Sequence, residues 1–430
     1  AIQPLIKALE YENEGVQWKA AETLGNIGDE ETILKLEGID TEKIDSAIQK
    51  IRARENGKPI LKLIGTSIQR IEPAERVLWA KTVIPKDKLK KPVDILLAEL
   101  GHEMEATYSG ARVKYLYMNP VFPCILQYFN SKNYPAISIS VTSSVTSSPS
   151  LSNIRVGYRI EGVMDYFVEQ TAENGVEAGF RLNIEPGQLF RSEARNLSLS
   201  LKVQFGNDQG EHEEVIGETI KIASKNSILW SKDFINGNVL DKKRFDELIA
   251  AFVTPNDRRI KGFLKGIEVS GLPKNEKGVL THLKAVYDRL TEEGFRYQAI
   301  GRDLVGDQLV QLPFETIGSK RGDCIEGSIL MASLTEALLC SEEENPIDPS
   351  LKERVHPLIA FIPGHAFFGF EGYPGKGEFY FLETTDLGRK SFEDSIRHGF
   401  RLYQENQEEI IIVDIEEARR MGIMPILTMD

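Results

Sequence analysis

The spacing of apolar residues changes twice along this chain, and that change limits the fold more than any other feature. Near the start, apolar residues recur at helical spacing at Ile2, Leu5, Ile6 and Leu9. From about residue 134 apolar and polar residues alternate, and from about residue 231 helical spacing returns. A chain of 430 residues is too long for one ordinary domain. We therefore expect a multi-domain protein with a helical segment, an all-β sandwich and an α+β domain.

The alternating region has the pattern of strands that bury one face. Its apolar positions are Ile137, Ile139 and Val141, then Ile154, Val156, Tyr158 and Ile160, then Leu197, Leu199, Leu201, Val203 and Phe205. Turns rich in Ser, Gly, Pro and Asn separate these runs. We expect an immunoglobulin-like β-sandwich over residues 134–230, without catalytic residues.

A second helical run, at Val16, Ala20, Leu24 and Ile27, follows the first and ends near a Gly-Asp pair. The stretch AIQPLIKALEYENEGVQWKAAETLGNIGDEETI, which holds both runs, resembles one HEAT repeat of the bacterial phycocyanobilin-lyase type. Such a unit cannot bury its apolar face alone, so several normally stack. The resemblance implies a HEAT-like segment at residues 1–50 that packs against other repeats or a protein partner. An ordinary helical hairpin is the alternative.

Residues 51–133 carry a weaker signal, and we expect them to form a connector. The stretch KTVIPKDKLKKPVD is rich in Lys and Pro, which is typical of a solvated linker. The apolar run YLYMNPVFPCILQYF contains Cys124, whose thiol we expect to be buried as a small hydrophobe.

Composition excludes several classes of partner. A formal charge of −13 argues against nucleic acid, because phosphate binding needs a basic face. No apolar run reaches the ~18–20 residues of a membrane span, so we expect no membrane partner. The three cysteines (Cys124, Cys324 and Cys340) are too few and too scattered for a disulfide framework, which favours a cytoplasmic setting. The chain does not begin with Met, which leaves open whether more repeats precede residue 1.

The chemistry concentrates in residues 231–430. Helical patterns occur in DKKRFDELIAAFVTPNDRRIKGFLKGI and in VLTHLKAVYDRLTEEG, and the loop LVQLPFETIGSKRGD follows. Next comes an amphipathic helix with Cys324 at its start and Cys340, expected to be inert, at its far end. The unpaired N–H groups of a helix start favour an anion, so they favour the thiolate of Cys324. The same groups could hold the oxyanion of an acyl intermediate.

Two further residues supply possible partners for this thiol. His365 lies in PGHAFFGF and Glu383 in EFYFLETTDLG, on runs that read as adjacent antiparallel strands. That pairing would bring the two side chains together, with the carboxylate holding one imidazole N–H and the other nitrogen facing the thiol. The remaining histidines are dispersed and no Cys pair exists, so we expect no metal and no cofactor.

The segments GDC plus helix, GHA, and Glu383-Thr384-Thr385 resemble the three core motifs of the transglutaminase-like superfamily, which has a papain-like cysteine protease fold. The stretches AFVTPNDRRI, FEDSIRHGF and DIEEARRMGIMPI resemble a set of bacterial members. The resemblance covers residues 231–430 and implies a catalytic triad of Cys324, His365 and Glu383. The family usually has Asp at the third position, so Asp386 is the alternative there. Gln311 and Gln298 are available as side chains for the oxyanion.

Three classes of function remain. The first is a cysteine-dependent amide-bond enzyme (a peptidase, a deamidase or a transglutaminase) that acts through a thioester on a protein or peptide substrate. Hydrolysis is our preference among these reactions. The second is a catalytically inactive transglutaminase-like scaffold that mediates protein–protein interaction. The third, an envelope or adhesion protein, is indicated only by the β-sandwich.

Overall fold

The computed structural model describes residues 61–64, 67–70, 77–85, 87–90, 94–144, 151–164, 166–236, 239–265, 267, 275–299, 306–339, 355–373 and 376–427. These residues form helices and several antiparallel sheets, an α+β mixture. The HEAT-like repeat expected at 1–50 and the thiol of Cys340 lie outside them. The first described strands, β1 (Leu61–Ile64) and β2 (Ser67–Arg70), pair with each other as an antiparallel hairpin.

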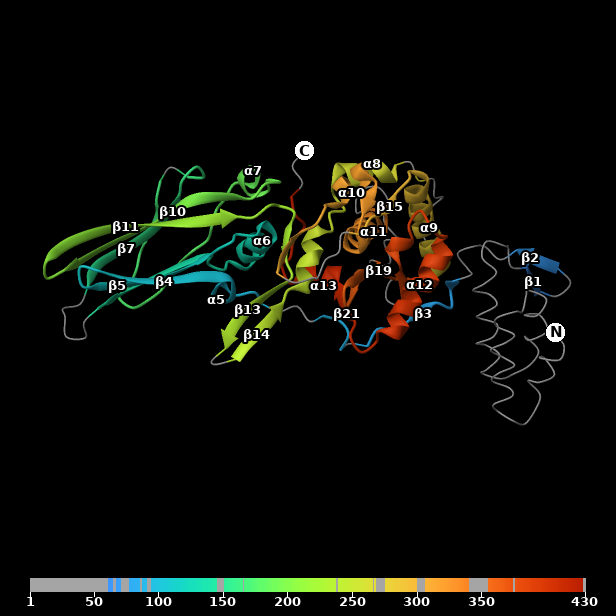
Figure 1. The fold of residues 1–430 in the computed structure, drawn as a ribbon, viewed down its shortest axis with the longest axis horizontal. Coiled ribbons are helices and arrows are strands. Elements are labelled where there is room, and N and C mark those ends of the chain that lie inside the picture. Colours follow the sequence, from blue (N-terminus) through green and yellow to red (C-terminus); the bar gives the residue numbers. More distant parts are fainter. Residues whose placement is uncertain are drawn as a thin grey trace, which may run out of the picture.

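Two four-stranded antiparallel sheets occupy one end of the long axis of the molecule (Figure 1). The first has the order β4-β5-β6-β9, and its strands are β4 (Gly101–Tyr108), β5 (Ala111–Met118), β6 (Ile137–Ser143) and β9 (Ala178–Phe180). The second has the order β11-β10-β7-β8, and its strands are β7 (Ser152–Ile160), β8 (Val168–Thr171), β10 (Arg195–Asn207) and β11 (Gly210–Ile222). The short helices here are α5 (Leu97–Leu100), α6 (Pro123–Lys132) and α7 (Pro186–Leu189).

The predicted alternation is confirmed in these sheets. The alternating positions of β6, β7 and β10 are buried in one shared core, with Leu197 partly buried at its margin. The strands nevertheless begin earlier than residue 134, because β5 pairs along its length with β6 and carries β4 beside it. Most residues of β4 are exposed on both faces, so this edge strand lacks the alternation that marks the others.

A five-stranded antiparallel sheet lies in the other half of the molecule, with the order β21-β18-β19-β20-β3. Its strands are β3 (Lys81–Thr82), β18 (Pro357–Ile362), β19 (His365–Glu371), β20 (Phe379–Leu382) and β21 (Ile411–Asp414). The edge strand β3 comes from the stretch expected to be a solvated linker. That expectation was wrong for Lys81–Thr82, which pair with β20, and for Ile84, which is buried in the core on one face of the sheet.

Helices cover both faces of this sheet. On one face, α11 (Cys324–Leu339) packs against β18 and β19. On the other, α12 (Phe392–Glu405) packs against β20, and the ring of Tyr403 stacks on Phe381 at 4.8 Å between centroids. Gly399 allows this approach, because a Cβ atom there would lie 2.5 Å from the backbone of Phe381. The sheet is therefore held rigidly between two helices.

The remaining elements surround this three-layer unit. They are β12 (Ser227–Leu229), β13 (Ser231–Asn236), β14 (Val239–Arg244), the 3₁₀ helix η2 (Asp246–Phe252), α8 (Arg258–Leu264), α9 (Glu276–Glu292), β15 (Arg296–Tyr297), β16 (Asp307–Leu309), α10 (Pro313–Ser319), β17 (Arg321–Gly322), the 3₁₀ helix η3 (Thr384–Asp386) and α13 (Ile415–Arg420). Two predictions fail here: DKKR belongs to a strand, β14, and the expected loop before Cys324 contains α10 and β17. No helix in the described ranges is long and apolar enough to cross a membrane.

Candidate active site

The start of α11 is built around the side chain of Asp323. Its Oδ1 accepts hydrogen bonds from the N–H groups of Ile325 (3.0 Å) and Glu326 (2.9 Å). In return, Oε2 of Glu326 accepts from the N–H of Asp323 at 3.1 Å. This reciprocal arrangement is a capping box, which fixes where the helix begins. Cys324 is consequently the first residue of the helix, as the sequence predicts.

Cys324 is also tied to the segment that follows β20. Its carbonyl oxygen accepts hydrogen bonds from the hydroxyl groups of Ser328 (2.6 Å) and Thr384 (3.3 Å). The two elements lie close because Gly327 has no side chain: a Cβ atom there would lie 3.0 Å from Cβ and Oγ1 of Thr384. Thr384 directly follows Glu383, so this contact sets the position of the acid relative to the cysteine.

His365 and Glu383 meet as the sequence predicts. His365 opens β19, Glu383 directly follows β20, and the two strands are antiparallel neighbours. The distance from Nε2 of His365 to Oε2 of Glu383 is 2.6 Å. The second carboxylate oxygen of Glu383 accepts a hydrogen bond from the N–H of Thr385 at 2.7 Å. With 1% of its side chain exposed, Glu383 is held in one orientation.

The hydrogen bonds of His365 decide its protonation. Burial alone would lower the pKa of His365, but hydrogen bonds to Cys324 and to Glu383 outweigh it and raise the pKa to about 10. A carboxylate only accepts, so Nε2 carries the proton toward Glu383 and Nδ1 is the nitrogen that remains for Cys324. Burial alone would raise the pKa of Glu383, yet the hydrogen bond and charge of His365, together with hydrogen bonds from Thr385, outweigh it and the pKa is lowered. The histidine and the acid therefore form an ion pair beside the thiol.

The alternative acid and the two glutamines have other partners. Asp386 accepts a hydrogen bond from Nδ1 of His398 at 2.8 Å and pairs with Lys390 at 3.0 Å. The side-chain oxygen of Gln311 accepts from the hydroxyl of Ser319, and Gln298 is exposed. No hydrogen bond or ion pair links these residues to the side chain of Cys324 or His365 within the described part of the chain.

The capping box leaves fewer free N–H groups at the helix start to bind an oxyanion than the sequence predicts. The N–H groups of Ile325 and Glu326 are already used by Asp323. The N–H of Cys324 itself has no such acceptor among the described residues, so it is the donor that remains at the helix start.

Tyr297 is a neighbour of the site that the sequence reasoning missed. It pairs with Gly322 in the short parallel ladder of β15 and β17, two residues before Cys324. Burial raises the pKa of Tyr297, and the charges of Cys324 and Asp323 raise it further. Parallel pairing of two dipeptides leaves no periodicity, so no sequence signal could have found it.

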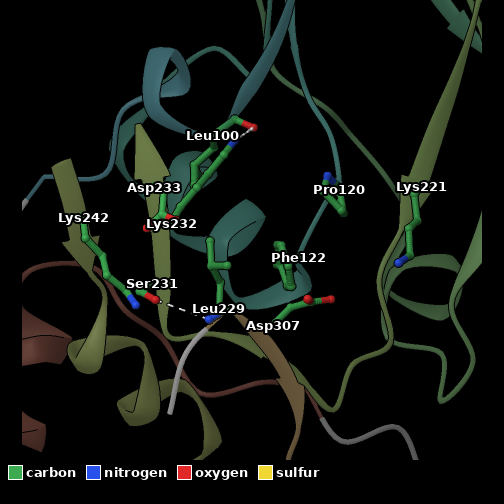
Figure 2. Close-up of a pocket in the computed structure, with 11 residues that line it drawn as sticks. Leu100, Pro120, Phe122, Lys221, Leu229, Ser231, Lys232, Asp233, Lys242 and Asp307 are labelled. Carbon is green, nitrogen blue, oxygen red and sulfur yellow. Dashed lines mark hydrogen bonds between the residues drawn. The ribbon is translucent and has the colours of Figure 1, made fainter. Parts of the chain in front are cut away.

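A cavity of about 580 Å³ lies elsewhere, between β11 and the β13–β14 hairpin (Figure 2). Its wall includes Lys221, Lys232 and Lys242, and Lys232 donates a hydrogen bond to the carbonyl oxygen of Leu100 at 3.1 Å. The cavity contains neither a cysteine nor a histidine. We therefore locate the candidate active site at Cys324, whose hydrogen bonding raises the pKa of His365.

No protein-family model matches this chain, and no curated protein matches it.

Proposed function

We propose that residues 231–430 form a transglutaminase-like, papain-like domain that acts on amide bonds with Cys324 as its nucleophile. The observation that carries the proposal is the position of His365, whose Nε2 lies 2.6 Å from Oε2 of Glu383 and whose pKa is raised by hydrogen bonding to Cys324 as well as to Glu383. A nucleophile, a base and a group that orients the base are the minimum set for covalent acyl transfer.

In the first half of the proposed reaction, the Cys324 sulfur attacks the carbonyl carbon of a carboxamide. The carbonyl oxygen becomes an oxyanion, which the N–H of Cys324 can stabilise. As the C–N bond breaks, His365 donates its proton to the leaving nitrogen and a thioester remains on Cys324. Glu383 keeps the imidazole in the tautomer that this transfer requires.

In the second half, an acceptor attacks the thioester carbon and His365 takes the acceptor's proton. The C–S bond then breaks and Cys324 is restored. Water as acceptor gives hydrolysis, our preferred outcome, and an amine gives a new amide bond. The proposed reaction uses no cofactor, and its substrate is a protein or peptide.

The other parts of the chain are proposed to recruit or position substrate proteins. We assign the two four-stranded sheets to an immunoglobulin-like sandwich, because their buried faces share one hydrophobic core. The HEAT-like segment at residues 1–50 would supply a protein-binding surface.

The test is acylation by p-nitrophenyl acetate, an activated acyl donor that needs no knowledge of the natural substrate. We expect release of nitrophenolate together with an acetyl adduct on the peptide containing Cys324, identified by mass spectrometry. Hydroxylamine should discharge the adduct, as it does any thioester, and Cys324→Ala should form none. A folded wild-type protein that forms no adduct at Cys324 would support the inactive scaffold instead.

A further inference from the structure

We infer that three exposed arginines, Arg296, Arg321 and Arg389, form an anion-binding rim beside Cys324 that selects acidic peptide segments. The role of this rim in choosing a substrate rests on the proposed function. Its ability to attract an anion does not, and the two can be tested separately.

Arg296 and Arg321 lie side by side. They are register partners in the parallel ladder of β15 and β17, and both side chains are exposed. Register partners on adjacent strands project from the same face of the ladder. Arg321 is three residues before Cys324, so their Cα atoms are at most ~11 Å apart. The backbone of Arg321 therefore lies near that of Cys324, and Arg296 is its register partner on the adjacent strand.

Arg389 approaches the same place from the turn after η3. Its guanidinium carbon lies 5.6 Å from the ring centroid of Tyr297, the residue that follows Arg296. Nη1 of Arg296 in turn donates a hydrogen bond to the carbonyl oxygen of Gly388 at 2.9 Å. Gly388 has φ +70°, and a Cβ atom there would lie 2.5 Å from that nitrogen, so the turn closes directly onto Arg296. The hydrogen bond and the ring contact bring Arg389 beside Arg296, and the register of β15 and β17 adds Arg321 to the same rim.

None of the three arginines has a carboxylate within ion-pair distance in the described ranges of the chain. Arg296 donates only to carbonyl oxygens, and Arg389 contacts an aromatic face. The nearby carboxylates of Asp323, Glu326 and Glu383 are buried and already accept hydrogen bonds. A cluster of cations without an ion-pair partner among the described residues is unusual on a chain with a formal charge of −13, where carboxylates are plentiful.

The chemistry of this rim fits carboxylate groups. A guanidinium offers paired N–H donors that match a carboxylate, and three of them favour several acidic side chains in succession. The net negative charge of the whole chain disfavours a long polyanion such as nucleic acid. An acidic peptide that brings its carboxamide to Cys324 is therefore the ligand that we propose.

The first test compares alkylation of Cys324 by anionic iodoacetate and by neutral iodoacetamide. The intrinsic reactivity of the thiol affects both rates equally, so the ratio of the iodoacetate rate to the iodoacetamide rate measures the electrostatic potential at Cys324. We expect Arg296→Gln, Arg321→Gln and Arg389→Gln each to lower the ratio about twofold at low salt, and the triple variant about fivefold to tenfold. At about 1 M salt the differences should largely disappear. Arg155→Gln, which makes the same change on β7, is the matched control and should leave the ratio as it is.

The second test uses an oligoglutamate peptide and an oligoglutamine peptide of equal length to protect Cys324 from iodoacetamide. We expect protection by oligoglutamate alone, and its loss in the triple variant. An unaltered reagent ratio in the triple variant, or equal protection by both peptides, would overturn the proposal. So would protection by an oligothymidylate that matches oligoglutamate. Slow alkylation by both reagents, with the ratio still dependent on the arginines, would overturn the proposed function and leave the rim intact.

Discussion

The starts of α6 and α11 carry the same residue in nearly the same place and give it opposite surroundings. Cys124 is the second residue of α6 and Cys324 is the first residue of α11. Cys124 is 0% exposed, and burial raises its pKa to about 12. Cys324 is partly exposed and is hydrogen-bonded to an imidazole. A helix start is therefore not enough to make a cysteine reactive.

The difference comes from segments that are distant in sequence. Several residues after Cys124 in its own helix, including Ile125, Leu126 and Phe129, are buried and apolar, and burial outweighs the backbone hydrogen bonds that lower the pKa of Cys124. Cys324 instead meets His365 at the start of β19, and η3 holds Glu383 behind that histidine. Tertiary structure, not helix position, separates the two thiols.

The largest effect that this comparison predicts is in alkylation of the native protein. Iodoacetamide should label Cys324 at least about 10³-fold faster than Cys124, because Cys124 can react only after local or global unfolding. Peptide mass spectrometry of a time course measures both rates in one sample. In denaturant the two rates should become similar, and comparable rates in the native state would contradict the comparison.

The second-largest expected effect is that of removing the negative charge of Glu383, which is hydrogen-bonded to His365. Glu383→Gln should lower p-nitrophenyl acetate acylation about 10²-fold, because the imidazole loses its orienting partner. An NMR titration should show the pKa of His365 falling from about 10 toward its ordinary value of 6.5. Asp386→Asn makes the same change of carboxylate to amide three residues later, where the partner is His398, and serves as the control. An equal loss of acylation rate in both variants would show that Glu383 is not the third member of the proposed triad.

The ion pair of His365 and Glu383 should make the free energy of unfolding depend on pH. Because the pKa of His365 is raised, its contribution to the free energy of unfolding is complete below pH 6.5 and is lost as the pH rises toward 10. Because the pKa of Glu383 is lowered, its contribution to the free energy of unfolding is complete above pH 4.5 and is lost in more acidic solution. Urea unfolding should therefore show the largest difference between wild type and Glu383→Gln from pH 4.5 to 6.5. A difference that grows toward pH 10 would contradict the ion pair.

A smaller effect is expected on the free energy of unfolding when each thiol becomes a hydroxyl. Cys124→Ser should cost about 1–3 kcal/mol, because it places a hydroxyl in an apolar interior. Cys324→Ser should cost less than about 0.5 kcal/mol, because that position is partly exposed. Denaturant titration of both variants checks the contrast, and equal costs would show that Cys324 is also a core residue.

The smallest expected effect concerns the contact that aligns Cys324 with η3. Gly327→Ala gains helix propensity but meets Thr384 at 3.0 Å, and we expect a net loss of about 1 kcal/mol with slower acylation. Gly262→Ala in α8 meets no atom within 4 Å and should be neutral or stabilising by up to about 1 kcal/mol. Unfolding and acylation assays on both variants test this. Equal behaviour would show that close packing at Gly327 is not needed.

The sequence predicts the parts of this molecule that carry local signals. The Gly-Asp-Cys before an amphipathic run indicates the start of α11, and two apolar runs with a short turn predict the β19–β20 pair that joins His365 to Glu383. Strict alternation likewise predicts β6, β7 and β10. In each case a short stretch of sequence determines both the element and the face that it buries.

What the sequence does not predict depends on distant partners. The exposed edge strand β4 has no alternation, and Lys81–Thr82 become a strand only because β20 offers a free edge. Tyr297 pairs with Gly322, two residues before Cys324, through a two-residue parallel ladder, which is invisible in a single sequence. The capping box uses N–H groups that a helix start alone would leave free for an oxyanion.

The measurement that tests the central claim most directly is the pH dependence of iodoacetamide alkylation at Cys324, in wild type and in His365→Asn. The account predicts that fast labelling of the wild type persists well below about pH 8, because the imidazolium stabilises the thiolate. In His365→Asn, labelling should rise only near about pH 8.5, as for an ordinary thiol. Identical profiles for the two proteins, both those of an ordinary thiol, would contradict a thiolate–imidazolium pair at Cys324 and His365.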